Sequence, residues 1–325
     1  MRSAEYTSGM EYSRRHVTIA LPGFPVTPQP RGRVRRFAVY PRGYAPVDAL
    51  IGVPEDPQGL TLQFVGFNAS LGPWEAAKLA LWASLSRTVV VTCELPGFSR
   101  YGHPLPRRIR EDLLNGDPTP WAMATLASLR AAAQAGGLPT PKTINVLGFS
   151  MGCSLAVAAL PTIQALYDVS SLTLVEPISL TSRTIGRLAV NNMADLMRLL
   201  KTVPRNYPSS WVWKVSLRQL REPSLRFTIA DFLASVTMLA SDDTGVRMDS
   251  MDLPVTNLAH GSRSKLCPAP QFSAVDSRLA SRGVPGITAT IDNLGHDCWH
   301  CLPALDALAR SFDNQISIPT GGAVR

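Results

Sequence analysis

The feature that most constrains the fold of this chain is a regular alternation of short apolar runs with longer runs of helical periodicity. Runs that are apolar throughout, rather than alternating with polar residues, predict strands buried on both faces of a sheet. Four such runs are LTLQFVG (60–66), TVVVT (88–92), TINVLGF (143–149) and SLTLVE (171–176). The alternation therefore predicts an α/β fold with a mostly parallel central sheet and helices on both faces.

Weaker runs extend this pattern toward both ends of the chain. Further strands are expected at residues 35–40, 49–53, 255–260 and 286–291. Helical spacing predicts helices at residues 73–85, 120–135, 151–167, 227–239 and 298–312. Pro73 fits a first helical turn, and Gly136 with Gly137 fits a helix end.

The length of 325 residues suits one core domain that carries an insertion. Residues beyond the strand at 171–176 are helical in pattern without an obvious strand, and they include Trp211 and Trp213. Those two tryptophans either line an apolar substrate pocket or attach the insertion to the core. The predicted organisation is a loose segment at 1–15, a core at 16–178 and 224–325, and a helical cap at 179–223.

Charge and cysteine content exclude several classes of protein. The net charge is +8, with basic runs at 31–36 and 100–110, but neither run is interleaved with aromatic residues. We therefore expect a solvated basic face and no nucleic-acid partner. The N-terminal apolar stretch is broken by Pro22 and Pro25, so it does not resemble a signal peptide. No run has the roughly 20 apolar residues of a membrane span. The five cysteines are scattered, which favours reduced thiols. Together these features predict a cytoplasmic protein and leave its oligomeric state open.

The run GFSMG places Ser150 between a predicted strand and a predicted helix of small residues. Five matching positions mean little alone, but this context is that of a strand-to-helix turn that exposes a nucleophile. Side chains at Gly148 and Gly152 would collide with the neighbouring strand and helix. The helix also directs its first N–H groups at the serine, where they favour an oxyanion. Ser150 is therefore the predicted nucleophile.

With these motifs, residues 60–312 resemble the α/β-hydrolase superfamily. In LTLQFVGFN, Val65 stands where members usually carry a His before Gly66, and the resemblance implies an oxyanion hole made by the backbone N–H groups of Phe67 and Met151. LGHD (294–297) resembles the family's catalytic His loop. The resemblance thus implies His296 as the general base that activates Ser150.

The acid of this predicted triad does not stand at the usual place. The resemblance puts an aspartate in the run HGSRSKL (260–266), where Ser264 is found instead, and a serine carries no charge to hold an imidazolium. A known variation of the superfamily supplies the acid from the end of the preceding strand, which here is Glu176. That position shares the carboxyl edge of the sheet with the nucleophile. Glu176 is the expected acid, with Asp242 and Asp243 as alternatives.

The run HDCWHC (296–301) crowds two His and two Cys into one helical start. Zinc sites with such ligands draw them from two separated pairs, so no metal is expected. Cys298 and Cys301 are expected to pack as small apolar residues. No Walker loop and no Gly-x-Gly-x-x-Gly run follows a strand, so no cofactor is expected either.

The sequence therefore predicts a serine hydrolase acting on a small-molecule acyl substrate through an acyl-enzyme. A carboxylic ester of a small or medium apolar acid is the first substrate class, by analogy with the fold. A peptidase, amidase or thioesterase with the same triad is an alternative. So is a catalytically silent binding protein, which Val65 and Ser264 suggest and the presence of both Ser150 and His296 opposes.

Overall fold

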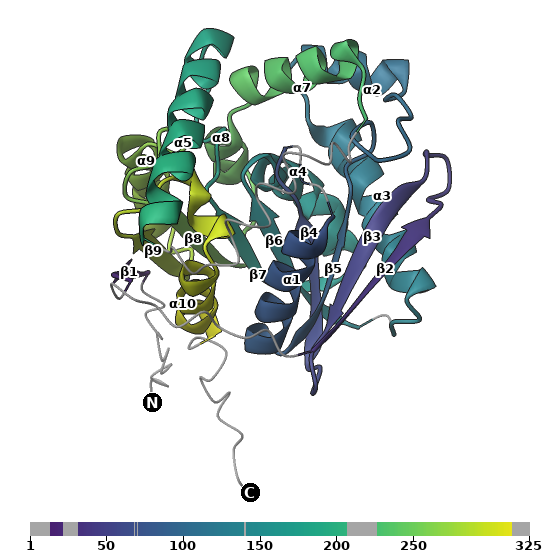
Figure 1. The fold of residues 1–325 in the computed structure, drawn as a ribbon, viewed down its shortest axis with the longest axis horizontal. Helices are drawn as coiled ribbons and strands as arrows, with labels where there is room; N and C mark the ends of the chain where they lie inside the picture. The colour runs from purple at the N-terminus through teal and green to yellow at the C-terminus, as the bar shows by residue number, and fades with distance from the viewer. Residues whose placement is uncertain are drawn as a thin grey trace, which may run out of the picture.

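The structure is a computed structural model that describes residues 14–21, 32–67, 69, 71–139, 141–206 and 226–313. The strands are β1 Arg15–Ile19, β2 Arg33–Val39, β3 Val47–Val53, β4 Gly59–Phe64, β5 Thr88–Cys93, β6 Thr143–Phe149, β7 Asp168–Val175, β8 Val255–Gly261 and β9 Ile287–Ile291. Within the described residues they form a nine-stranded sheet in the order β1-β9-β8-β7-β6-β4-β5-β3-β2 (Figure 1).

The sheet is mostly parallel, as predicted. Every neighbouring pair from β1 to β5 in that order is parallel, and β3 and β2 add an antiparallel edge. In the register Phe64 lies beside Gly148, which in turn lies beside Leu174. The strands β4, β6 and β7 therefore end together at one edge of the sheet.

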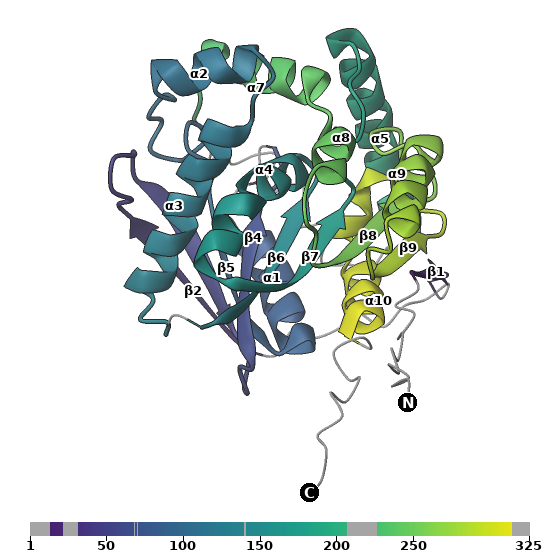
Figure 2. The same ribbon diagram turned by 180° about the vertical axis from the view of Figure 1, so that it is seen from behind.

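Helices cover both faces of the sheet. They are α1 Pro73–Ser86, α2 Arg107–Leu114, α3 Thr119–Ala135, α4 Met151–Leu166, α5 Ile185–Asn206, α7 Ile229–Ser241, α8 Thr244–Asp249, α9 Ala269–Ser281 and α10 Leu302–Asp313, with a 3₁₀ turn η1 at His296–His300. Helices α1 and α10 pack together on the face seen in Figure 1, and α3 and α4 pack together on the face seen in Figure 2. The predicted α/β architecture is confirmed.

A further layer of helices lies over the edge where the parallel strands end. Both views show α2, α5 and α7 there, and α2 packs against α7 (Figures 1 and 2). Helix α5 falls within the predicted cap, but residues 207–223, with Trp211 and Trp213, lie outside the described residues. The helix expected at 227–239 is α7, and it lies in this layer beside α2. Helix α2, which begins within the basic run at 100–110, was not predicted.

Two sequence predictions need correction. The loose segment was expected to reach residue 15, but Arg15 already belongs to β1, which pairs with β9. Asp276 holds this strand through Arg14 at 2.8 Å and His16 at 2.6 Å. These partners are some 260 residues away, so no local pattern reveals the strand.

The last predicted helix, at 298–312, is divided in two. The 3₁₀ turn η1 ends at His300 and α10 begins at Leu302. Pro303 fits this division, because proline suits the first turn of a helix, whereas inside a continuous helix it would lack the N–H that bonds to the carbonyl four residues back. In the part of the chain that the structure describes, no helix is both long and apolar enough to cross a membrane.

Candidate active site

Ser150 occupies a sharp turn between β6 and α4. Its φ of 56° and ψ of −123° lie in a region that non-glycine residues rarely adopt. The turn is held by a hydrogen bond from the Ser150 N–H to the Val175 carbonyl at 2.9 Å. The strained conformation lifts the serine out of the strand, as the sequence predicted.

The glycines around the serine permit this turn. A Cβ at Gly148 would lie 2.7 Å from the Cα of Cys153, and one at Gly152 would lie 2.1 Å from the carbonyl oxygen of Phe64. The first collision is with the helix and the second is with β4, so both predicted collisions are confirmed. Any larger residue at either position would push α4 away from the sheet.

His296 lies between the serine and a carboxylate. Its Nε2 is 2.9 Å from Oγ of Ser150, and its Nδ1 is 2.9 Å from Oε2 of Glu176. The three residues come from the end of β6, the start of η1 and the residue after β7. The fold thus brings together the three side chains that the sequence singled out, from positions up to 146 residues apart.

Glu176 is fully buried and has a positive φ of 55°. Its Oε1 accepts the N–H of Gly261 at 2.5 Å, and its Oε2 also accepts the hydroxyl of Ser264 at 2.7 Å. Ser264, at the position of the missing aspartate, is therefore a hydrogen-bond donor to the carboxylate. No local pattern predicts this contact, because it joins residues 88 positions apart.

The alternative acids make other contacts. Asp242 accepts from Thr244 at 2.8 Å and from Arg247 at 3.1 Å. Asp243 caps α8 by accepting the N–H of Val246. The carboxylate that contacts His296 belongs to Glu176.

The two residues expected to form an oxyanion hole flank the serine. Met151 is the first residue of α4, where N–H groups have no acceptor within the helix. Phe67 follows Gly66, and a Cβ at Gly66 would lie 3.1 Å from the Cβ of Ser150. Their role toward an oxyanion stays a prediction.

Aromatic rings surround this site. The ring of Phe149 stacks on His296 with centroids 5.3 Å apart. Phe67 contacts Phe98 at 5.2 Å and Phe232 of α7 at 5.7 Å, and Phe232 stacks on the half-exposed Phe227 at 5.9 Å. These rings form a continuous aromatic wall that runs from Phe67, next to Gly66, to the half-exposed Phe227.

One contact between the overlying helices and the site was missed from the sequence. Asp195 of α5 is buried, and its carboxylate accepts the N–H groups of Lys265 at 2.9 Å and Leu266 at 2.8 Å. Its Oδ1 also lies 3.2 Å from the place of a Cβ on Gly295. Asp195 thus ties α5 to the loop after β8 that carries Ser264, and it lies close to Gly295 next to His296. A single aspartate in a helical pattern gives no signal of such a role.

The run HDCWHC does not gather into a metal site. Cys298 and Cys301 are buried, in agreement with their predicted apolar packing. His300 instead contacts Nζ of Lys78 at 3.3 Å. Among the described residues, no three His, Cys, Asp or Glu side chains are arranged to hold a metal ion.

The sheet order, the two helical layers and the turn at Ser150 together define the α/β-hydrolase fold. Solved structures with this fold include the ester-hydrolase EH1AB1 from the metagenome of Lake Arreo, with a TM-score of 0.54, 16% identity, and coverage of 90% of this chain and 86% of that one. The esterase PF2001 of Pyrococcus furiosus has a TM-score of 0.52 and 10% identity, covering 88% and 89%. The thermostable carboxylesterase EstE1 from a metagenomic library has a TM-score of 0.50 and 19% identity, covering 88% and 90%. No protein-family model and no curated protein matches the sequence.

Proposed function

We propose that this protein is a serine hydrolase that cleaves carboxylic esters through an acyl-enzyme. The observation that carries the proposal is the continuous chain of contacts from Ser150 through His296 to Glu176. In the proposed reaction, Oγ of Ser150 attacks the carbonyl carbon of the ester while Nε2 of His296 takes the proton of the Ser150 hydroxyl. His296 then gives the proton to the leaving alcohol. Water next attacks the acyl-enzyme while Nε2 of His296 takes a proton from it, and His296 returns that proton to Oγ of Ser150 as the carboxylic acid leaves.

The contacts of His296 support its role as the base. Nδ1 faces a carboxylate, which only accepts, so the ring proton belongs on Nδ1 and Nε2 is free to accept from Ser150. Buried Glu176 then stabilises the imidazolium that forms in the transition state. The N–H groups of Phe67 and Met151 would bind the oxyanion, a contribution typically worth about 10²–10³ in rate for each donor.

An apolar acyl substrate fits the aromatic wall beside Ser150. The solved esterases share only the fold with this chain, so they support the ester class by analogy. Peptides, amides and thioesters are the competing substrates, since the same three residues serve all of them. The cytoplasmic location stays an expectation from the sequence.

A turnover assay tests the proposal. Wild type is expected to hydrolyse p-nitrophenyl esters of short and medium acids, and Ser150→Ala is expected to lose about 10⁴-fold or more of kcat/KM. Ser281→Ala is the matched control, because Ser281 lies exposed at the end of α9 and is expected to leave turnover unchanged. Turnover of thioesters or peptide amides alone would keep the triad but replace the substrate class. Wild type that is folded yet inactive on every acyl substrate would favour a silent binding protein.

A further inference from the structure

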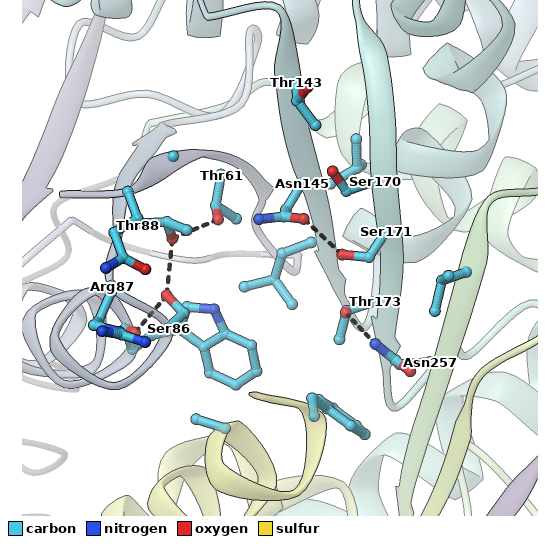
Figure 3. Close-up of a pocket in the computed structure, with 18 of the residues that line it drawn as sticks. Thr61, Ser86, Arg87, Thr88, Thr143, Asn145, Ser170, Ser171, Thr173 and Asn257 are labelled. Atoms are coloured by element: carbon cyan, nitrogen blue, oxygen red, sulfur yellow. Dashed lines mark hydrogen bonds between the residues drawn. The ribbon is translucent and has the colours of Figure 1, made fainter. Parts of the chain in front are cut away.

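A cavity lies toward the end of the sheet away from Ser150. It has a volume of about 670 Å³ and is enclosed by the first residues of the parallel strands and the last turns of α1 and α10 (Figure 3). Thr143, at the start of β6, lines it, whereas Ser150 follows the end of that strand. Six strand residues lie between Thr143 and Ser150, so these two residues are roughly 20 Å apart. The lining extends along β6 to Leu147, but none of the lining residues belongs to the site proposed above.

The side of this cavity that is formed by the sheet is polar. Central strands covered by helices on both faces are usually apolar, yet Thr61, Asn145 and Ser171 stand side by side on β4, β6 and β7. Thr173 and Asn257 form a second such pair on β7 and β8. All five line the cavity. Hydroxyls and amides placed this way need partners, because burying them unpaired is unfavourable.

These polar groups satisfy one another only in part. Ser171 donates to Oδ1 of Asn145 at 2.8 Å, and Asn257 donates to the Thr173 hydroxyl at 3.4 Å. The Thr61 hydroxyl contacts that of Thr88 at 2.7 Å. The structure gives the amide nitrogen of Asn145 no acceptor among the described residues. In Figure 3 these side chains point into one common space, so they present a row of donors and acceptors to whatever fills it.

The remaining walls are aromatic and cationic. Trp82 and Phe312 line the cavity and lie against each other with centroids 6.5 Å apart. Arg87 is exposed and is the only charged side chain among the described lining residues. No described carboxylate forms an ion pair with it. An unpaired guanidinium beside a hydroxyl-rich wall favours a ligand that carries an anion.

We propose that this cavity binds a small hydroxyl-rich molecule with one anionic group, of the class of the monosaccharide phosphates. The row of Thr, Ser and Asn side chains matches the hydroxyls of a sugar, the Trp82 ring covers its apolar face, and Arg87 holds the phosphate. The volume lies within the range of about 300–1,000 Å³ found for small-molecule sites. The site does not depend on the proposed hydrolase activity, so Ser150→Ala binds such a ligand as wild type does.

Titration calorimetry on the full chain tests this site with glucose 6-phosphate, ribose 5-phosphate, glucose and inorganic phosphate as probes. Wild type is expected to bind at least one sugar phosphate at least tenfold more tightly than either glucose or inorganic phosphate. Arg87→Ala is expected to remove the preference for the sugar phosphate over glucose. Arg130→Ala, an exposed arginine on α3, is the matched control and leaves binding unchanged.

The polar row is tested separately from the arginine. Asn145→Leu is expected to weaken binding of the sugar phosphate at least tenfold, and Thr61→Val, a change of similar volume, gives the same result should Asn145→Leu fail to fold. The proposal is overturned when wild type binds no probe at 10 mM, when inorganic phosphate binds as tightly as the sugar phosphates, or when neither Arg87→Ala nor the polar-row variants change the affinity.

Discussion

Two polar clusters lie on either side of Phe149. Each contains a glutamate and a histidine, and the two histidines come from the same short turn, η1. The Glu176 cluster consists of Glu176, Ser264 and His296, and the Lys78 cluster consists of Glu75, Lys78 and His300. Phe149 stacks on His296 at 5.3 Å and meets His300 edge-on at 5.5 Å.

The clusters differ in what faces the imidazole. His296 has an oxygen at each ring nitrogen, the carboxylate of Glu176 and the hydroxyl of Ser150. The Nδ1 of His300 faces Nζ of Lys78 at 3.3 Å and Nε1 of Trp74 at 3.4 Å. Burial and the Lys78 charge hold the pKa of His300 well below its usual value, so it stays neutral. The carboxylate of Glu75 pairs with Lys78 at 2.6 Å instead of with the histidine.

The groups that face each imidazole therefore determine whether that histidine can act as a base. A histidine that accepts from a buried cation has a weakened affinity for a proton. A histidine between a carboxylate and a hydroxyl can take the hydroxyl proton. Only the Glu176 cluster therefore has the arrangement of a general base, although HDCWH presents two histidines in one short run.

The largest expected difference is between the two histidines. His296→Ala is expected to lower kcat/KM for an ester by about 10⁴-fold or more, because no other group accepts the Ser150 proton. His300→Asn, which keeps an acceptor near Lys78, is expected to change kcat/KM less than about tenfold. Steady-state kinetics of both folded variants measures this difference. Equal losses of kcat/KM in the two variants would contradict the comparison.

The two glutamates are expected to differ next. Glu176→Gln removes the charge that holds the imidazolium, and a loss of about 10³–10⁴-fold in kcat is expected. Glu75→Gln, the matched control, is expected to retain most of the turnover in the fraction that folds. Full turnover by Glu176→Gln would place the acid elsewhere.

Ser264 gives a smaller effect. Ser264→Ala removes one hydrogen bond to a buried carboxylate, worth about 1.5–3 kcal/mol, only part of which is felt in the transition state. A loss of about tenfold in kcat with little change in KM is expected. Ser262→Ala, in the same loop but bonded to Asp292, serves as the control. A loss as large as that of Glu176→Gln would mean that Ser264 does more than orient the carboxylate.

Asp195 tests the link from α5 to the Glu176 cluster. Asp195→Asn weakens its bonds to the N–H groups of Lys265 and Leu266 by about 1 kcal/mol, since a neutral acceptor replaces a charged one. A loss of about fivefold in kcat/KM is expected. Asp243→Asn, which caps α8 elsewhere, is expected to leave the kinetics unchanged, and an equal loss in both variants would point to general destabilisation.

The smallest effect concerns stability and comes from the Lys78 cluster. Because His300 has a lowered pKa when folded, the unfolded chain binds more protons once the pH falls below about 6.5. Its contribution to stability is therefore present above that pH and is lost at about 1.4 kcal/mol per pH unit below it. Urea unfolding at pH 7.5 and 5.5 is expected to show a steeper loss for wild type than for His300→Asn. An identical pH dependence of stability in wild type and His300→Asn would show that folding does not lower the pKa of His300.

The sequence predicts those parts of the molecule that local patterns determine. The apolar strands and the glycines beside Ser150 follow from short runs, whereas the choice of Glu176 and His296 comes from the resemblance to the α/β-hydrolase superfamily. Contacts between distant segments give no such signal. Ser264 contacts Glu176, and Asp195 contacts the loop after β8, only through the tertiary fold. Likewise β1 pairs with the distant β9, and Asp276 binds Arg14 and His16 beside it.

The most direct test of the account is labelling with a fluorophosphonate, read by intact mass and peptide mapping. We expect one adduct on wild type, located at Ser150, with no adduct on Ser150→Ala, much slower labelling of His296→Ala, and unchanged labelling of Ser281→Ala. A folded wild-type protein that takes no label, or an adduct that persists in Ser150→Ala, would contradict the assignment of Ser150 as the nucleophile.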